Sequence, residues 1–147
     1  MTVYQPSTTI ADLRAAIGNL ASSQIANVAR VYTTEPDGPP EDHSIVVGSP
    51  TWRILSDTNA KMLVEFTFPV SYCVIRRQLG EDVDDVESYF LPMLFAFSSW
   101  ANQDLTDDAF ITDVDKGGVI QVGYSGEIVR AIRMLIKVTT EFNIPVS

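Results

Sequence analysis

The longest alternation of apolar and polar positions in the chain runs from Ala60 to Arg77, in the segment AKMLVEFTFPVSYCVIRR. The apolar side chains fall on its even positions: Met62, Val64, Phe66, Phe68, Val70, Tyr72 and Val74. This two-residue period predicts a half-buried β-strand. At about 3.3 Å per residue the strand would span roughly 60 Å, whereas a globule of this chain length is only about 40 Å across. The part of the strand that exceeds the domain must therefore pair with other strands.

Pro69, in the middle of this segment, restricts where the strand can lie in the sheet. Proline cannot donate a hydrogen bond to a β-ladder, so it predicts an edge strand or a bulge. One hypothesis is a strand that bends at Pro69 and continues as an arm that pairs with a neighbouring subunit, because unpaired edges recruit other chains. Identical arms on identical chains favour a closed, symmetric oligomer. The alternative is a bulged strand confined to one domain.

Two further segments have helical periodicity. Ser7 to Ser23 carries an apolar stripe, and Thr9 with Asp12 fits a capping box that begins a helix. A central helix is expected to begin in the acidic run that starts at Glu81, because carboxylates favour the positive end of the helix dipole. Pro92 predicts a kink, or a restart with Pro92 at the first position of a second segment that ends between Trp100 and Gln103.

The remaining patterns predict strands. Short strands are expected within 27–35, at 44–48 and at 51–55, and residues 109–126 predict a hairpin that turns at Asp115 to Gly118. Residues 127–142 fit a strand or a helix, and their β-branched content favours the strand. The sequence therefore predicts a single domain over residues 1–147 of the α+β class. Its mostly antiparallel β-sheet has long strands and is packed by the N-terminal helix and the central helix.

Composition and charge restrict the class of protein. The chain is 46% apolar, which is typical of a folded domain with its own core. Its net charge of −9 argues against direct binding of nucleic acid, which usually requires a basic patch. The N-terminal residues lack the pattern of a secretory signal, and no apolar run is long enough to span a membrane. We expect no membrane association and synthesis in a cytoplasm-like compartment.

The residues offer little for catalysis or cofactor binding. The single histidine, His43, lies in a loop rich in proline and acidic residues, and we interpret it as a solvated loop residue. The single cysteine, Cys73, lies in the alternating strand, and we interpret it as a small buried hydrophobe. Asp82 and Asp85 share a helix face, so a small metal-dependent enzyme is one alternative, although an acidic first turn explains them as well. We predict no catalytic, cofactor-binding or metal-binding residues.

The order of elements resembles a known family. A helix (IADLRAAIGNL) precedes a strand and a proline-rich acidic turn (VYTTEPDGPPEDHSIVVG), a long strand (KMLVEFTFPVSYCVIRR), a central helix (DVDDVESYFLPML) and a closing hairpin (GYSG…AIRMLIKV). This pattern, over nearly the whole chain, is similar to the tail terminator (tail-completion, minor tail) proteins of long-tailed bacteriophages. The resemblance implies a virion protein without catalytic residues. It also implies a homo-oligomeric ring, usually a hexamer, that caps the head-proximal end of the tail tube.

The resemblance also implies partners: the tail tube protein, a head-completion or connector protein, and DNA that passes through the ring without specific binding. For the interfaces we expect the loop at Pro39 and Pro40, which is stiff and exposed. We also expect contacts at four residues whose types are common in binding hot spots: Trp52, Arg76, Arg77 and Trp100. For both tryptophans, core packing is the alternative. Two further hypotheses for the whole chain are a head-closure or other head–tail connector (neck) protein and a soluble accessory domain.

Overall fold

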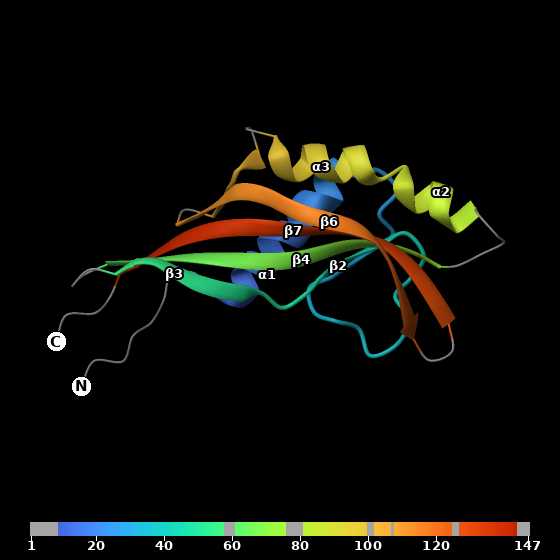
Figure 1. The fold of residues 1–147 in the computed structure, drawn as a ribbon, viewed down its shortest axis with the longest axis horizontal. Coiled ribbons are helices and arrows are strands. Elements are labelled where there is room, and N and C mark those ends of the chain that lie inside the picture. The colour runs from blue at the N-terminus through green and yellow to red at the C-terminus, as the bar shows by residue number, and fades with distance from the viewer. Residues whose placement is uncertain are drawn as a thin grey trace.

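A curved, mostly antiparallel sheet forms the body of the protein, and helices cover one of its faces (Figure 1). The computed structural model describes residues 9–57, 61–75, 81–99, 102–106, 108–124 and 127–143. In chain order the elements are α1 (Ile10–Gln24), β1 (Arg30–Tyr32), β2 (Ser44–Val47), β3 (Thr51–Asp57), β4 (Lys61–Ile75), α2 (Glu81–Glu87), α3 (Phe90–Ser98), β5 (Asp104–Thr106), β6 (Ala109–Tyr124) and β7 (Glu127–Asn143). The predicted α+β class, with long strands, an N-terminal helix and a central helical segment, is confirmed.

The strand order explains the length of β4. The path is β1-β2-β4-β7-β6-β5, with β3 pairing β4 beside β2. β7 covers one side of β4 without a register shift, from Lys61↔Asn143 to Ile75↔Val129, while β3 and β2 cover successive parts of the other side. The hypothesis of a β4 arm that leaves the domain is therefore wrong, because strands of the same chain pair with both sides of β4, and β7 pairs along its full length. The result is the elongated sheet of Figure 1.

Pro69 lies in this central strand, so the prediction of an edge strand or a bulge is wrong. Its carbonyl oxygen accepts a hydrogen bond from the Gly48 N–H (2.8 Å). In an extended strand the N and C=O of one residue point to the same side, so the missing Pro69 N–H faces the place where β2 ends and β3 begins. β2 pairs only as far as Val70, and β3 starts at Thr67. Proline is tolerated because no partner strand requires its N–H there.

Gly117 and Gly118 lie inside β6, so the predicted turn at Asp115 to Gly118 is also wrong. β6 pairs along β7 as far as Tyr124↔Glu127, and the register shifts between Val114 and Gly117. The glycines thus serve a β-bulge and not a turn. A Cβ on Gly117 would collide with the backbone carbonyl oxygen of Arg133 on β7. Pairing with a long neighbouring strand overrides the local turn signal.

The helices follow the predictions more closely. The capping box is present, with Thr9 Oγ1 accepting from Asp12 N (3.2 Å) and Asp12 Oδ2 accepting from Thr9 N (3.0 Å). The central segment restarts as predicted, but α3 begins at Phe90, so that Pro92 is its third residue and not its first. The amides of the first helical turn have no intrahelical acceptor, so proline is tolerated at this position as well. α3 ends at Ser98, earlier than expected.

The core lies between the helices and one face of the sheet. Even-numbered side chains of β4 and β7 meet α1 and α3 there, as the alternation predicted, and the largest fully buried members are Leu13, Ile17, Ile45, Phe68, Tyr72, Met93, Phe97 and Ile136. A smaller buried cluster on the opposite face contains Val46, Cys73, Val129 and Ala131. The strand interpretation of residues 127–142 is confirmed by β7, whose alternating side chains contribute to both clusters.

Candidate assembly surfaces

The first candidate surface is on β3, and we call it the strand surface (Trp52, Ile54 and Leu55). Among the described residues β3 pairs with β4 alone, so it is an edge strand. Its three large apolar side chains are exposed, and Trp52 retains 65% of its accessible area. An exposed apolar edge is a site at which sheets recruit another chain.

The strand surface continues the buried face of the sheet. Trp52 lies opposite Phe66 and Ile54 lies opposite Val64, and cross-strand neighbours project to the same face. Phe66 and Val64 belong to the main core. A shallow cavity of about 300 Å³ opens here, lined by Trp52, Ile54, Val64, Phe66, Ile10, Met62 and Phe142. The core face of the sheet is thus left partly open at β3.

The second candidate surface is the outer side of α3 with the adjacent part of β6, and we call it the helix surface (Phe90, Leu91, Phe95 and Val119). All four side chains are exposed, Phe95 at 64%. Leu91 and Phe95 are one helical turn apart and share a face, while the inner side of α3 buries Met93, Ala96 and Phe97. A helix that is apolar all round is normally buried. The outer face of α3 therefore has the character of a contact surface.

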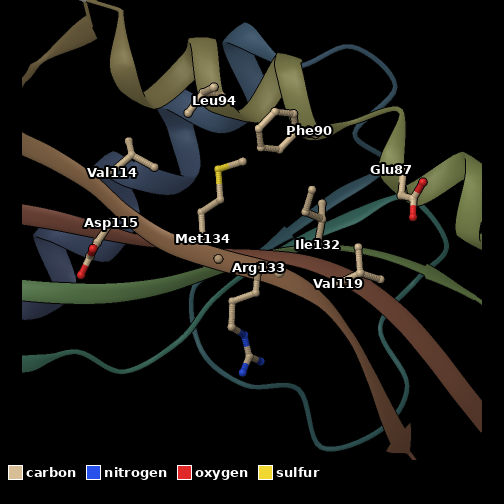
Figure 2. Close-up of a pocket in the computed structure, with 11 residues that line it drawn as sticks. Glu87, Phe90, Leu94, Val114, Asp115, Val119, Ile132, Arg133 and Met134 are labelled. Atoms are coloured by element: carbon tan, nitrogen blue, oxygen red, sulfur yellow. The ribbon is translucent and has the colours of Figure 1, made fainter.

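A cavity of about 480 Å³ adjoins the helix surface, between α3 and the bulged part of β6 (Figure 2). Phe90 and Leu94 line it from the helix, and Ile132 and Met134 line it from β7. Its other lining residues are Val114, Gly117, Gly118 and Val119 of β6 and three charged residues, Glu87, Asp115 and Arg133. The Arg133 side chain points away from the cavity in Figure 2, and its Nε donates to Ser71 Oγ at 3.0 Å. The cavity is therefore mostly apolar. Glu87 is an exposed carboxylate at its rim, whereas Asp115 pairs with Lys137 (3.6 Å).

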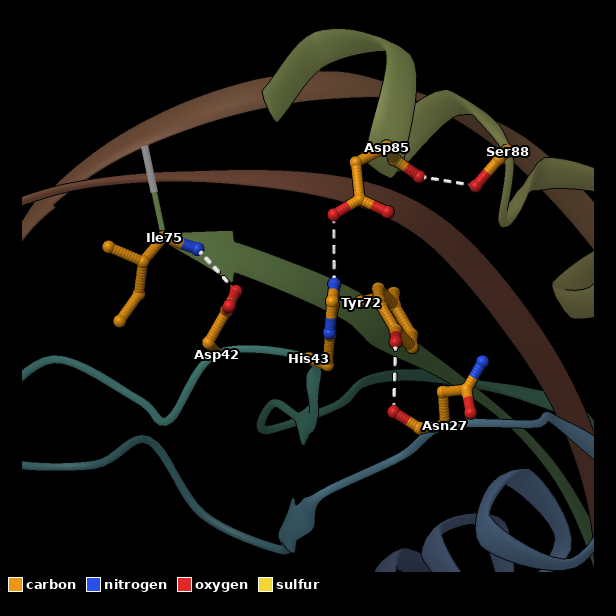
Figure 3. Close-up of polar contacts among 7 residues, drawn as sticks. All are labelled: Asn27, Asp42, His43, Tyr72, Ile75, Asp85 and Ser88. Carbon is orange, nitrogen blue, oxygen red and sulfur yellow. Dashed lines mark hydrogen bonds and ion pairs between the residues drawn. The ribbon is translucent and has the colours of Figure 1, made fainter. Parts of the chain in front are cut away.

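A polar cluster holds α2 in place next to this cavity (Figure 3). His43 Nε2 lies 2.9 Å from Asp85 Oδ2 on α2, and Asp42 Oδ1 accepts from Ile75 N at the end of β4 (3.1 Å). His43 is half-buried and has a φ of 59°, a left-handed conformation that is uncommon for residues other than glycine. The interpretation of His43 as a solvated loop residue is therefore wrong. The cluster ties the loop before β2 to the helical segment.

Two aromatic rings complete this cluster. Tyr72 and Tyr89 stack with their ring centroids 3.8 Å apart, and each lies 6.0 Å from the His43 ring. The Tyr72 hydroxyl donates to the Asn27 carbonyl oxygen (3.3 Å). Burial, followed by hydrogen bonding with Tyr89, raises the pKa of Tyr72 well above its usual range. The phenol therefore stays neutral and acts as a structural group between the core and α2.

Cys73 is buried, as its interpretation as a small buried hydrophobe predicted, although it lies on the face opposite the even-numbered side chains of β4. Burial, aided by the nearby Glu35 carboxylate, raises the pKa of its thiol from the ordinary 9.0 to about 12, and Arg133 opposes the shift only in part. Because the thiolate is the nucleophile and the metal ligand, the thiol is held in its unreactive form. The described residues contain no group of three or more histidine, cysteine, aspartate or glutamate side chains placed to hold a metal ion. Asp85 pairs with His43, and the side chain of Asp82 lies outside the described part.

The residues expected at interfaces fall in different places. Trp52 is exposed on β3, so the alternative of core packing is wrong for it. Pro39 is half-buried and Pro40 is buried, so the loop is less exposed than expected. Arg76, Arg77 and Trp100 lie outside the described residues. Nothing in the structure tests their role as contacts, and that role stays a prediction.

The helix surface was missed by reasoning from the sequence. The sequence pattern predicts a helix for the segment FLPMLFAF of α3 and assigns no partner to its outer side. It is apolar on both sides of the helix, and that excess is a signal of an additional partner. Val119 carries no such signal, because it lies in an ordinary strand pattern.

Comparisons with known proteins give a similarity of fold. Neither protein-family models nor curated protein sequences match this chain. A solved structure described as "Virion of native gene transfer agent (GTA) particle" contains a similar chain, with a TM-score of 0.50 and 14% sequence identity. The similarity covers 92% of this chain and 99% of that chain. At this identity it shows a common fold over almost the full length of both. No helix in the described ranges is long and apolar enough to cross a membrane.

Proposed function

We propose that this chain is a structural subunit of a phage-like virion. The observation that carries the proposal is the common fold with a chain of a gene transfer agent virion, which extends over 99% of that chain. The similarity thus concerns a complete subunit and not a shared fragment. The two exposed apolar surfaces support the proposal, because contiguous apolar surface outside the core is typical of contact sites.

Within the virion, we infer the role of a tail terminator. The subunits form a ring, usually sixfold in the family that the sequence resembles, at the head-proximal end of the tail tube. The ring stops tube growth and joins the tube to the head connector. The net charge of −9 suits a ring through which DNA passes without being retained, since attraction to phosphate requires cationic groups. The role is structural: the His43–Asp85 pair fastens a loop to α2, and the Cys73 thiol is buried and unreactive.

The proposal is tested by locating the chain in finished particles. Particles from the system that encodes it are purified, labelled with gold-conjugated antibody against the chain, and imaged by negative-stain microscopy. We expect gold at the junction of head and tail, and at one end only of free tails. An antibody against the major head protein is the matched control for labelling. Particles in which the chain is absent by immunoblot would contradict the proposal and favour a soluble accessory protein.

A further inference from the structure

We propose that the strand surface of one copy docks onto the helix surface of a second copy, with Trp52 inserted at the cavity beside Phe90 and Val119. The inference deepens the proposed assembly role, on which it rests, by naming the two surfaces that meet. The partner at each surface is another copy of the same chain.

The sheet topology separates the two surfaces. β3 lies beside β4 on the side of β2, whereas β6 lies beyond β7 on the other side. Two full-length strands, β4 and β7, therefore stand between the strand surface and the helix surface. Strands in a sheet are about 4.8 Å apart, so β4 and β7 keep Trp52 away from Phe90 and Val119 of the same chain. A second copy brings them together.

The two surfaces are complementary in shape and polarity. Trp52 projects from an edge strand, whereas the helix surface is hollowed by an apolar cavity of about 480 Å³, which has room for an indole ring. Exposed Phe90 and Val119 border that cavity, so an inserted Trp52 would contact aromatic and aliphatic carbon. Tryptophan in an apolar pocket is a frequent hot spot of protein interfaces.

Charge also distinguishes the two surfaces. Next to Trp52, the Arg53 side chain is 69% exposed, while its ion-pair partner Glu65 (3.1 Å) is only 12% exposed. The exposed charge at β3 is therefore mainly that of the Arg53 guanidinium. The cavity rim carries the opposite charge at Glu87, whose side chain is exposed, whereas Asp115 pairs with Lys137 (3.6 Å). Complementary potentials of this kind orient two copies and suppress pairing of like surfaces.

This contact joins two different surfaces, so it is heterologous. A docked pair keeps one free strand surface and one free helix surface, on different copies, and the series ends only when the rotation between copies closes a ring. A two-fold dimer would instead use the same surface on both copies. The proposal thus accounts for a ring without any additional arm.

The test uses two variants of the full chain, Trp52→Glu and Val119→Glu, each of which destroys one surface and keeps the other. Both residues are exposed, so we expect folded proteins, which circular dichroism and thermal melting verify. In sedimentation velocity up to high micromolar concentration, the wild type should form oligomers larger than a dimer. Each variant alone should be monomeric. An equimolar mixture should give a dimer and nothing larger, because only one junction, between intact Trp52 and intact Val119, can form.

Phe110→Glu provides the matched control, since Phe110 is exposed but belongs to neither surface, and it should assemble like the wild type. A monomeric wild type, or a mixture of the two variants that remains monomeric, would overturn the proposed docking. Neither result bears on the location of the chain in particles, which is measured separately. Conversely, a mixture that dimerises while the chain is absent from particles would keep the docking and remove the virion role.

Discussion

Tyr72→Ala should lower the free energy of unfolding by about 3–5 kcal/mol, the usual cost of removing a large buried aromatic side chain. Tyr72 is fully buried, stacks on Tyr89 and lies against His43. Its loss leaves a cavity under α2 and removes the support of the His43–Asp85 pair. Urea denaturation monitored by circular dichroism measures the change.

Tyr72→Phe is the control for this prediction, because it keeps the ring and removes only the hydroxyl that bonds the Asn27 carbonyl. We expect a loss of about 1 kcal/mol, typical of a single hydrogen bond. If the alanine variant lost no more than the phenylalanine variant, the ring would not be the centre of the cluster that positions α2.

Gly117→Ala should destabilise the protein by about 3 kcal/mol, the upper end of the range for overpacking. A Cβ at this position would collide with the Arg133 carbonyl oxygen, which is backbone and cannot rotate away. We therefore expect β6 and β7 to separate locally, with faster amide exchange on both strands. Hydrogen exchange followed by NMR reports the local effect, and urea denaturation reports the global one.

The adjacent residue is a matched control. A Cβ on Gly118 meets nothing within 4 Å, so Gly118→Ala should change stability by no more than about 0.5 kcal/mol, as for ordinary surface positions. Equal effects at the two glycines would contradict the bulge that shapes the cavity of the helix surface.

Local periodicity predicted the elements of this fold well. The alternation in β4 identified which side chains enter the core, and the capping box at Thr9 identified the start of α1. Both signals arise from interactions within a few residues, so the sequence displays them directly. The apolar alternation of residues 127–142 also favoured a strand correctly, although helical spacing competed with it.

The errors concern partners that are distant in sequence. The tolerance of Pro69 depends on the change of partner from β2 to β3, and the conformation of Gly117 depends on β7. His43 was misjudged because its partner Asp85 is 42 residues away. The position of the helix surface depends on which side of α3 packs against the sheet. Hydrophobicity alone does not separate a core position from a contact position.

The central claim is that the chain terminates tails, and the most direct measurement is the tail-length distribution with the gene intact and deleted. Negative-stain microscopy of lysates should show overlong, headless tubes in the deletion and tubes of uniform length when the gene is restored. Tails of normal length that fail to join heads would contradict termination and assign the chain to the neck connector. Unchanged, infectious or transducing particles would contradict any structural role in the virion.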